Sequence, residues 1–409
     1  MFIESRLLRH FDLGVLIATI LIVACGLIAI YSSTYTQQAQ GTQQNFDKQV
    51  LWLVFGLFLL GTVLATSFRV YFKFAYPAYL ITLLLLLLVL LVGTGTGAKR
   101  WIPLGAFWIQ PAEFAKIGTL LALAKYLSRD NRNVNKLREL LFAFGIVFLP
   151  ILLIIRQPDL GSSLVFVALV LPMLHWAGLS SIYLFVLLAP LLSLICAFNY
   201  YSFFLAMLVI SLVLLLSQKG LRFFLINFVL NIGVGISTPL FWNFLKEYQK
   251  KRILTFLGLV TDPSGLGYQV IQSKVAIGSG GFGGKGFLHG TQTHLRFLPE
   301  QHTDFILSVI GEEFGFIGVM FVLILFLFII IKGIKLATVV KSEFLRLLIL
   351  GSVCIMAFQV LVNVGMTVGI MPVTGLPLPF LSYGGSALLT NLTLIGFILN
   401  GSIRRFEYL

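Results

Sequence analysis

The chain has 409 residues, of which 58% are hydrophobic and only 11% are charged, and its mean hydropathy is +0.99. A soluble protein of this length could not cover so apolar a composition with polar surface, so a soluble globular domain is excluded. The formal net charge of +14 does not indicate nucleic-acid binding, because basic residues in a polytopic membrane protein first report topology and contact with anionic lipid headgroups.

The composition predicts an all-α polytopic membrane protein. Runs such as Leu80 to Val92 match the apolar segments of about 20 residues that span hydrocarbon, and backbone groups in lipid must be paired internally, so the spans are helices. The connections within 161–242 are very short, so we expect about 10–12 transmembrane helices. The apolar segments lie near 11–33, 47–67, 71–93, 111–127, 140–156, 161–178, 182–199, 202–217, 221–242, 306–332, 345–369 and 380–401.

Lysine and arginine predict the orientation of these spans. With the N-terminus inside, the basic groups near 6–9, 69–73, 125–138, 219–222, 332–346 and 404–405 all fall on the cytoplasmic side, which satisfies the positive-inside rule. We therefore expect a multi-pass protein of the cytoplasmic (inner) membrane with both termini cytoplasmic. The loops at 94–110 and 243–305 then lie outside, as does the connection between the last two spans.

The first outer loop and the spans that follow it carry polar residues. Lys99 and Arg100 run against the topology rule, so they indicate either headgroup contact or a site for an anionic substrate. Glu113 and Lys116, three residues apart at the start of a predicted helix, share a face and can form an internal ion pair. Asp159, at an outer boundary, could cap the next helix or form the polar floor of a cavity.

The large outer loop, residues 243–305, is predicted to be structured, because a loop of this length in a compact protein is usually functional. It contains the glycine-dense run from Gly278 to Gly286, and glycines allow backbone to approach a ligand closely. The run fits either a phosphate cradle or a plain re-entrant turn. It is not a Walker A motif, because Lys285 is followed by Gly286.

The end of this loop concentrates charge beside an apolar helix, with Arg296, Glu300, His302 and Asp304 close together. A carboxylate at a membrane boundary costs free energy, so a functional role for Asp304 is the default hypothesis. The connection between the last two spans contains three prolines between 372 and 379, which exclude a regular helix. Apolar irregular backbone at that depth must be buried in protein or line a cavity.

Several of these motifs resemble the SEDS family (shape, elongation, division, sporulation). The resemblance extends from the first span to the last, and we treat residues 1–409 as one integral membrane domain. The amino-acid sequence from Gly369 to Pro379 is more similar to the rod-shape branch of the family than to its division branch. The motifs are Lys99 to Ile102, Tyr268 to Lys274, the glycine-rich run with Lys285-Gly286, Leu298 to Phe305, and Pro377 to Ser386.

The resemblance implies a peptidoglycan glycosyltransferase that polymerises lipid II into glycan strands at the outer face of the cytoplasmic membrane during cell elongation. It also implies work with a class B penicillin-binding protein, which crosslinks the strands. By matching position, Asp304 is the essential aspartate of the family, and Glu113, Lys116 and Asp159 match its other polar cavity residues. Trp101 matches a loop tryptophan that is important for activity.

The chain departs from the family pattern in two places. At Arg296 the family often has glutamate, so a carboxylate role cannot be transferred to that position. Residues 182–242 have room for three spans where the family leads us to expect one, and these are predicted extra transmembrane segments. An even insertion preserves the outer location of the large loop.

The chemistry implied by the resemblance needs a base for the attacking sugar hydroxyl and positive charge for the departing pyrophosphate. Asp304 is the predicted general base, because a carboxylate at a low-dielectric boundary can have its pKa raised towards working pH. Glu300 is a supporting residue, since Pro299 argues against a helix there. A divalent cation such as Mg²⁺ could help to neutralise the pyrophosphate. The candidate pyrophosphate clamps are Lys99, Arg100, Lys274, Lys285 and Arg296.

Two other classes of function use similar residues. A flippase or transporter for the same lipid would also place ionisable groups inside the membrane, but it should show repeat symmetry and a polar path to the cytoplasm. A non-catalytic scaffold for wall synthases would not need a boundary carboxylate beside a basic loop. A division-type member of the same family remains the alternative within the enzyme class.

Overall fold

The computed structural model describes residues 10–38, 44–94, 99–105, 107–129, 133–245, 247–256, 266–294 and 301–407, and it is almost entirely helical. The long helices are α2 (Leu13–Gln38), α3 (Gln44–Ala65), α4 (Phe68–Val92), α5 (Pro111–Leu127), α6 (Leu137–Arg156), α7 (Leu160–Trp176), α8 (Ser181–Cys196), α9 (Tyr200–Leu216), α10 (Leu221–Ile236), α15 (Ile306–Val339), α16 (Glu343–Thr367) and α17 (Gly385–Ile403). The shorter elements are α11 (Thr238–Phe244), α12 (Glu247–Phe256), α13 (Leu266–Gly280), α14 (Thr291–His294) and the antiparallel pair β1 (Ile102–Leu104) and β2 (Phe107–Ile109).

Each apolar segment predicted from the sequence overlaps one of these long helices, which confirms an all-α polytopic membrane protein. Among the described helices, α2, α3, α4, α6, α15, α16 and α17 are long and apolar enough to cross a bilayer. The bent pair of α10 and α11 makes an eighth if it counts as one span. Helices α5, α7, α8 and α9 have only 16 or 17 residues, which is slightly short for a helix that crosses a bilayer alone.

Helices α5, α16 and α17 form the centre of the bundle and contact one another. Nearly every residue of α17 is buried, and α5 is buried over most of its length while also contacting α4, α6 and α7. The outer helices α2, α3 and α4 leave large apolar side chains exposed, as lipid-facing helices do. The bundle therefore has a protein-filled centre and an apolar flank.

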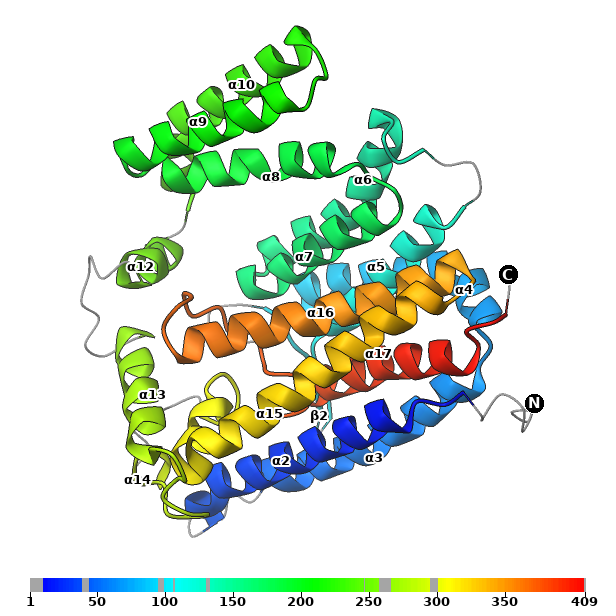
Figure 1. Cartoon of the computed structure of the whole chain (residues 1–409). Helices are drawn as coiled ribbons and strands as arrows, with labels where there is room; N and C mark the ends of the chain where they lie inside the picture. Colours follow the sequence, from blue (N-terminus) through cyan, green and yellow to red (C-terminus); the bar gives the residue numbers. More distant parts are fainter. Residues whose placement is uncertain are drawn as a thin grey trace.

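Helices α8, α9 and α10 contact one another and form a lobe at one side of the bundle, which α8 joins through α7 (Figure 1). Within the lobe, the buried Ser193 hydroxyl donates a hydrogen bond to Asn231 Oδ1 at 2.8 Å and so links α8 to α10. Such side-chain hydrogen bonds are one of the forces that associate helices in lipid. The three apolar segments expected in residues 182–242 are thus three helices.

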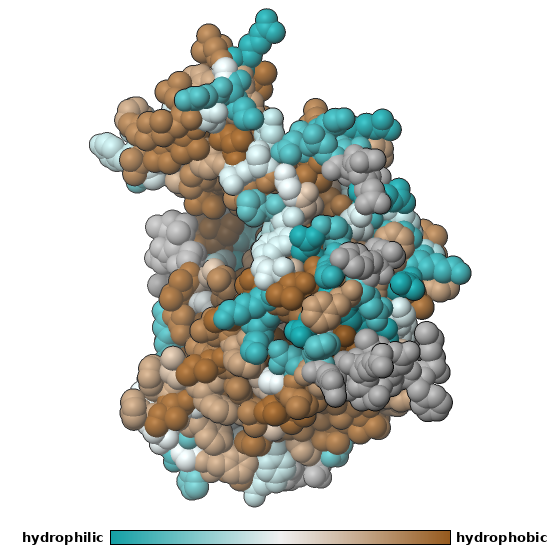
Figure 2. All heavy atoms as spheres, turned by 45° about the vertical axis from the view of Figure 1, so that its right-hand side comes forward, coloured by the Kyte–Doolittle hydropathy of each residue, from teal (hydrophilic) through white to brown (hydrophobic). Residues whose placement is uncertain are grey.

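The two ends of the bundle differ in character. The start of α2 and the end of α17 lie at one end, and α12, α13 and α14 lie at the other (Figure 1). Figure 2, in which the end with the start of α2 is turned forward, shows hydrophilic residues gathered there and apolar residues over the lobe and the lower flank. The large loop is structured where it is described, because it folds into α12, α13 and α14.

The glycine-rich run packs into a break in α15. The helix is interrupted at Gly315, whose φ of 63° and ψ of −159° are not helical. Around the break, the Lys285 amide donates to the Glu312 carbonyl at 3.0 Å and the Gly286 amide to the Glu313 carbonyl at 3.0 Å. The Lys285 and Gly286 amides are therefore bound to α15, and the Gly284 amide is bound to the Gly280 carbonyl within the run. These contacts favour a backbone clamp of the re-entrant-turn kind over a phosphate cradle.

We expect Gly284→Ala to destabilise this clamp. Gly284 has a φ of +82°, and a Cβ added there would lie 2.1 Å from the Glu313 carbonyl oxygen. A side chain in left-handed backbone costs about 1–3 kcal/mol before the steric clash is counted, so the melting temperature of the detergent-purified protein should fall clearly. Gly145→Ala is the matched control, because an added Cβ there meets no heavy atom within 4 Å. Equal melting temperatures for the two variants would contradict the clamp.

Candidate active site

A cavity of about 910 Å³ is lined in part by α12 and α13. These helices lie at the end of the bundle opposite the start of α2 and the end of α17 (Figure 1). The lining of the cavity comes from segments that are far apart in the sequence: α3, the 100–110 loop, α12, α13, the residues before α15, and the connection between α16 and α17. Of the residues predicted from sequence, Asp304, Arg100 and Trp101 line it. The fold thus brings the predicted base and one predicted clamp into the same cavity.

Asp304 lies two residues before α15, on a turn whose backbone is held from several sides. The Asp304 carbonyl accepts from Asn363 Nδ2 at 3.0 Å, and the His302 carbonyl accepts from the Tyr383 amide at 2.8 Å. The Thr303 carbonyl accepts from the Ser382 hydroxyl at 2.5 Å. These contacts with α16 and the start of α17 fix the turn that presents the Asp304 side chain.

The proline-containing connection between α16 and α17 lines the cavity, as its irregular apolar backbone predicted. Val373, Thr374, Gly375 and Pro377 contribute to the wall. A Cβ added at Gly375 would lie 3.5 Å from Asp304 Oδ2, so the carboxylate faces this backbone. The connection is therefore part of the site.

Cationic side chains reach the cavity from separate elements. Lys48 comes from α3, Arg100 from the loop before β1, and Arg252 from α12. Arg100 is also anchored, because its Nε donates to the Gln157 carbonyl at 3.3 Å and its Nη2 to the Pro158 carbonyl. Sequence reasoning did not select Lys48 or Arg252. Lys48 did carry a signal, since a lysine at the outer end of the second predicted span opposes the positive-inside rule.

The other predicted clamps lie elsewhere. Lys99 is exposed and is not part of the described lining, and the exposed Lys274 packs over Gly369 just after α16. Lys285 pairs with the buried Glu312 carboxylate at 2.7 Å, so its charge is already engaged within the protein. Arg296 and Glu300 lie outside the described residues.

The remaining polar residues predicted from sequence are structural neighbours of the cavity. Lys116 and Glu113 form the expected ion pair at 2.6 Å, and both side chains are only 1% exposed. Asp159 caps α7, because its carboxylate accepts from the Ser162 amide at 3.1 Å. It also accepts from Gln110 Nε2 at 3.3 Å, and Gln110 lines the cavity. None of the three residues is part of the described wall, and Asp159 links the start of α7 to the lining residue Gln110.

Aromatic side chains form much of the rest of the wall. Trp52, Trp101, Phe107 and Trp108 line the cavity, and the Trp52 and Phe107 rings meet edge to face with centroids 5.0 Å apart. Tyr383 is a further lining residue, and burial raises the pKa of its hydroxyl above the ordinary value of 10.0. A tyrosine hydroxyl can donate a hydrogen bond, so Tyr383 adds a potential donor to the wall.

The cavity has few ligands for a protein-held metal ion. No cluster of three or more His, Cys, Asp or Glu side chains suited to a metal occurs among the residues that the structure describes. Asp304 is the one carboxylate in the described lining. With Asp304 as the base, a Mg²⁺ ion at the pyrophosphate would be held mainly by the phosphates of the substrate, as Mg²⁺ often is.

Comparison with known proteins shows which family has a similar sequence. The chain matches the FtsW/RodA/SpoVE family, described as cell cycle proteins, over residues 13–206 and 190–407. The peptidoglycan glycosyltransferase MrdB of Escherichia coli (strain K12) is 34% identical over 385 residues, which cover 93% of this chain and 92% of that protein. The peptidoglycan glycosyltransferase RodA of Treponema pallidum (strain Nichols) is 34% identical over 433 residues, covering 98% and 99%.

A solved structure is also similar over nearly the whole chain. It is a chain from a peptidoglycan synthase complex in which polymerization and crosslinking are structurally coordinated. The TM-score is 0.71 at 32% identity, with 97% of this chain and 99% of that chain covered.

The buried ion pair of Glu113 and Lys116 should contribute to the thermal stability of the protein. Removing one member of a buried ion pair leaves an uncompensated charge and costs about 3–5 kcal/mol, so Glu113→Gln and Lys116→Met should each lower the melting temperature strongly. The double variant removes both charges and should be more stable than either single variant. Thermal unfolding of the purified proteins checks this, and additive losses in the double variant would contradict a coupled pair.

Proposed function

The chain belongs to the FtsW/RodA/SpoVE (SEDS) family, and we propose on that basis that it is a peptidoglycan glycosyltransferase that polymerises lipid II during cell elongation. The observation that carries the chemistry is the single cavity that joins the Asp304 carboxylate to Lys48, Arg100 and Arg252. A base and a set of cations are the two requirements of transfer from a lipid-linked pyrophosphate.

Asp304 acts as the general base in this proposal. A hydroxyl oxygen of one saccharide attacks the anomeric carbon of another, and the hydroxyl proton passes to the Asp304 carboxylate. The bond between the anomeric carbon and the pyrophosphate oxygen breaks, so in-line displacement inverts the anomeric centre. General-base assistance of this kind contributes about 10²–10⁴-fold to the rate.

Lys48, Arg100 and Arg252 stabilise the negative charge that develops on the departing pyrophosphate. Arg100 suits this role because its contacts with the Gln157 and Pro158 carbonyls hold the guanidinium in place before substrate binds. A divalent cation such as Mg²⁺ would add charge at the same position. The aromatic wall offers flat apolar surfaces to the sugar rings, and the exposed apolar flanks of the bundle suit the prenyl tails.

We place the cavity on the extracytoplasmic side of the inner membrane, with both termini cytoplasmic. The placement is supported by the basic groups at the predicted cytoplasmic ends of the spans. It is also supported by α12 and α13, which line the cavity and lie at the end of the bundle opposite the start of α2 and the end of α17. Lipid II and the growing glycan strand would then be bound from the outer leaflet.

The proposed partner is a class B penicillin-binding protein that crosslinks the strands. The similar solved structure supports a partner of this kind, because it comes from a synthase complex that coordinates polymerization with crosslinking. Lipid-exposed helix faces on the bundle provide the surface on which a membrane-anchored partner could pack.

Asp304→Asn should abolish formation of glycan strands from labelled lipid II, because the amide cannot accept the hydroxyl proton. Membrane insertion and melting temperature should stay near those of the wild type. The assay is run with purified protein, with and without a class B partner, and its products are separated by length. Near-normal strand formation by this variant in the presence of the partner would overturn the role of Asp304. Flipping of lipid II in liposomes without strand formation by wild type would indicate a transporter instead.

Arg252→Gln should lower kcat for lipid II polymerisation by about 10²-fold, which is the loss typical for one electrostatic contact to a developing charge. Lys251→Gln is the matched control, because Lys251 is the exposed neighbour on α12 and is not part of the described cavity lining. Similar rates for both variants would remove Arg252 from the proposed set of cations.

A further inference from the structure

We propose that the Glu312 carboxylate positions the segment that carries Asp304, and thereby sets the rate of the glycosyl transfer. The inference rests on the proposed function of Asp304 and adds a residue that lies outside the described cavity lining. Glu312 is fully buried on the second turn of α15, with 0% of its side chain exposed. A buried carboxylate persists only where charge and hydrogen bonds compensate its lost hydration.

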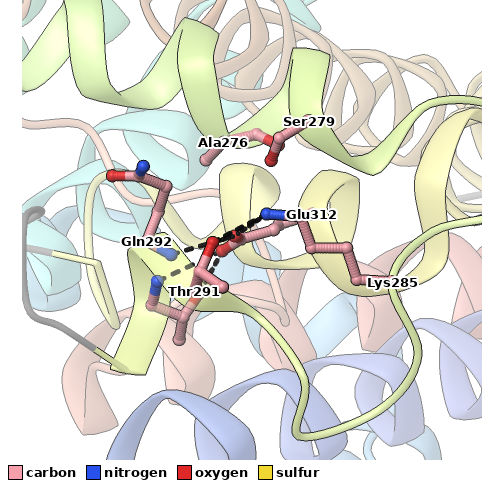
Figure 3. Close-up of polar contacts among 7 residues, drawn as sticks. Ala276, Ser279, Lys285, Thr291, Gln292 and Glu312 are labelled. Atoms are coloured by element: carbon pink, nitrogen blue, oxygen red, sulfur yellow. Dashed lines mark hydrogen bonds and ion pairs between the residues drawn. The ribbon is translucent and has the colours of Figure 1, made fainter.

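The Glu312 carboxylate accepts hydrogen bonds from five donors (Figure 3). Oε1 accepts from Lys285 Nζ at 2.7 Å, from Thr291 Oγ1 at 3.1 Å and from the Gln292 amide at 2.9 Å. Oε2 accepts from the Thr293 amide at 3.1 Å and from Thr293 Oγ1 at 2.9 Å. All five donors come from one short stretch, so the carboxylate organises α14 and its approach.

In the sequence, this stretch precedes the residues that carry Asp304. The described chain resumes at Gln301, whose Nε2 donates to the Ser33 carbonyl at 3.0 Å. The turn at Asp304 is held by Asn363 and by Ser382 and Tyr383, just before α17. Glu312 lies on α15, the helix that begins two residues after Asp304, so its carboxylate ties α14 to the helix that follows the proposed base.

The anchor is separable from the backbone clamp on α15. The clamp uses main-chain carbonyls of Glu312 and Glu313, which a side-chain substitution leaves in place. Glu312→Gln keeps the shape of the side chain, but its amide NH₂ cannot accept the two hydrogen bonds from Thr293. The Lys285 ammonium also loses its negative partner. The substitution should loosen α14 while the glycine-rich run stays docked.

A misplacement of a catalytic group by about 1 Å can cost about 10²-fold in rate, so we expect Glu312→Gln to lower kcat for strand formation by about tenfold or more. KM for lipid II should change by less than about twofold, because the cavity cations lie on other elements. The melting temperature is measured on the same samples, so that loss of folded protein is separated from loss of turnover. Glu343→Gln is the matched control, because that glutamate forms an i,i+3 pair with Arg346 away from the cavity.

A second pair of variants keeps the proposal testable if Glu312→Gln does not fold. Thr293 is 1% exposed, and Thr293→Val removes its hydroxyl donor while keeping its shape. Thr293→Ser retains the donor. We expect kcat to fall severalfold in the valine variant and to be recovered in the serine variant.

The results separate three cases. Unchanged kcat in folded Glu312→Gln, or equal kcat in the two Thr293 variants, would overturn the positioning role. A fall in activity that matches the loss of folded protein would also overturn it and leave a structural role. Absence of glycan strands from the wild type with its partner would instead refute the proposed function.

Discussion

The organisation of this protein depends on the way in which backbone hydrogen bonds are completed where α15 breaks. A helix in lipid must satisfy its own amides and carbonyls, so an interruption at Gly315 is tolerated only where other backbone takes over. The glycine-rich run does this, because its amides bind the carbonyls of Glu312 and Glu313 and its Gly281 carbonyl accepts from the Phe316 amide at 2.9 Å. The break thus attaches the large loop to the bundle and sets where the segment leading to Asp304 begins.

The cavity gathers its chemistry from elements that are distant in sequence. The carboxylate sits on the turn before α15, while the cations arrive from α3, the first outer loop and α12. The Arg100 guanidinium is held on the carbonyls before α7, and the backbone of the Asp304 turn is held by Asn363 and Ser382. Groups held before substrate binds need little reorganisation during the reaction, which is the physical basis of electrostatic catalysis.

The sequence predicted the helices, the ion pair of Glu113 and Lys116 and a functional position for Asp304, because each depends on local spacing or on an apolar environment. For Asp159 it left a helix cap and a cavity floor open, and the structure shows the cap. It was harder to predict which cationic side chains line the cavity. Lys285 was predicted as a clamp because it is a basic residue of the outer loop, yet its partner is a glutamate of α15, 27 residues later. Charge on a loop shows that a counter-charge is required, but only the fold shows whether a ligand or the protein supplies it.

The lobe of α8, α9 and α10 shows why a large local difference need not alter the site. Its helices pack on one another through contacts such as Ser193 with Asn231, and α8 joins the bundle beside α7. We propose that two of these helices are extra relative to the family. An even number of added crossings returns the chain to the same side of the membrane, so α12 and the large loop still reach the cavity. The packing of the lobe can therefore differ from that of the family while Arg252 and Asp304 stay in one cavity. The site requires only that the number of membrane crossings added in this region be even.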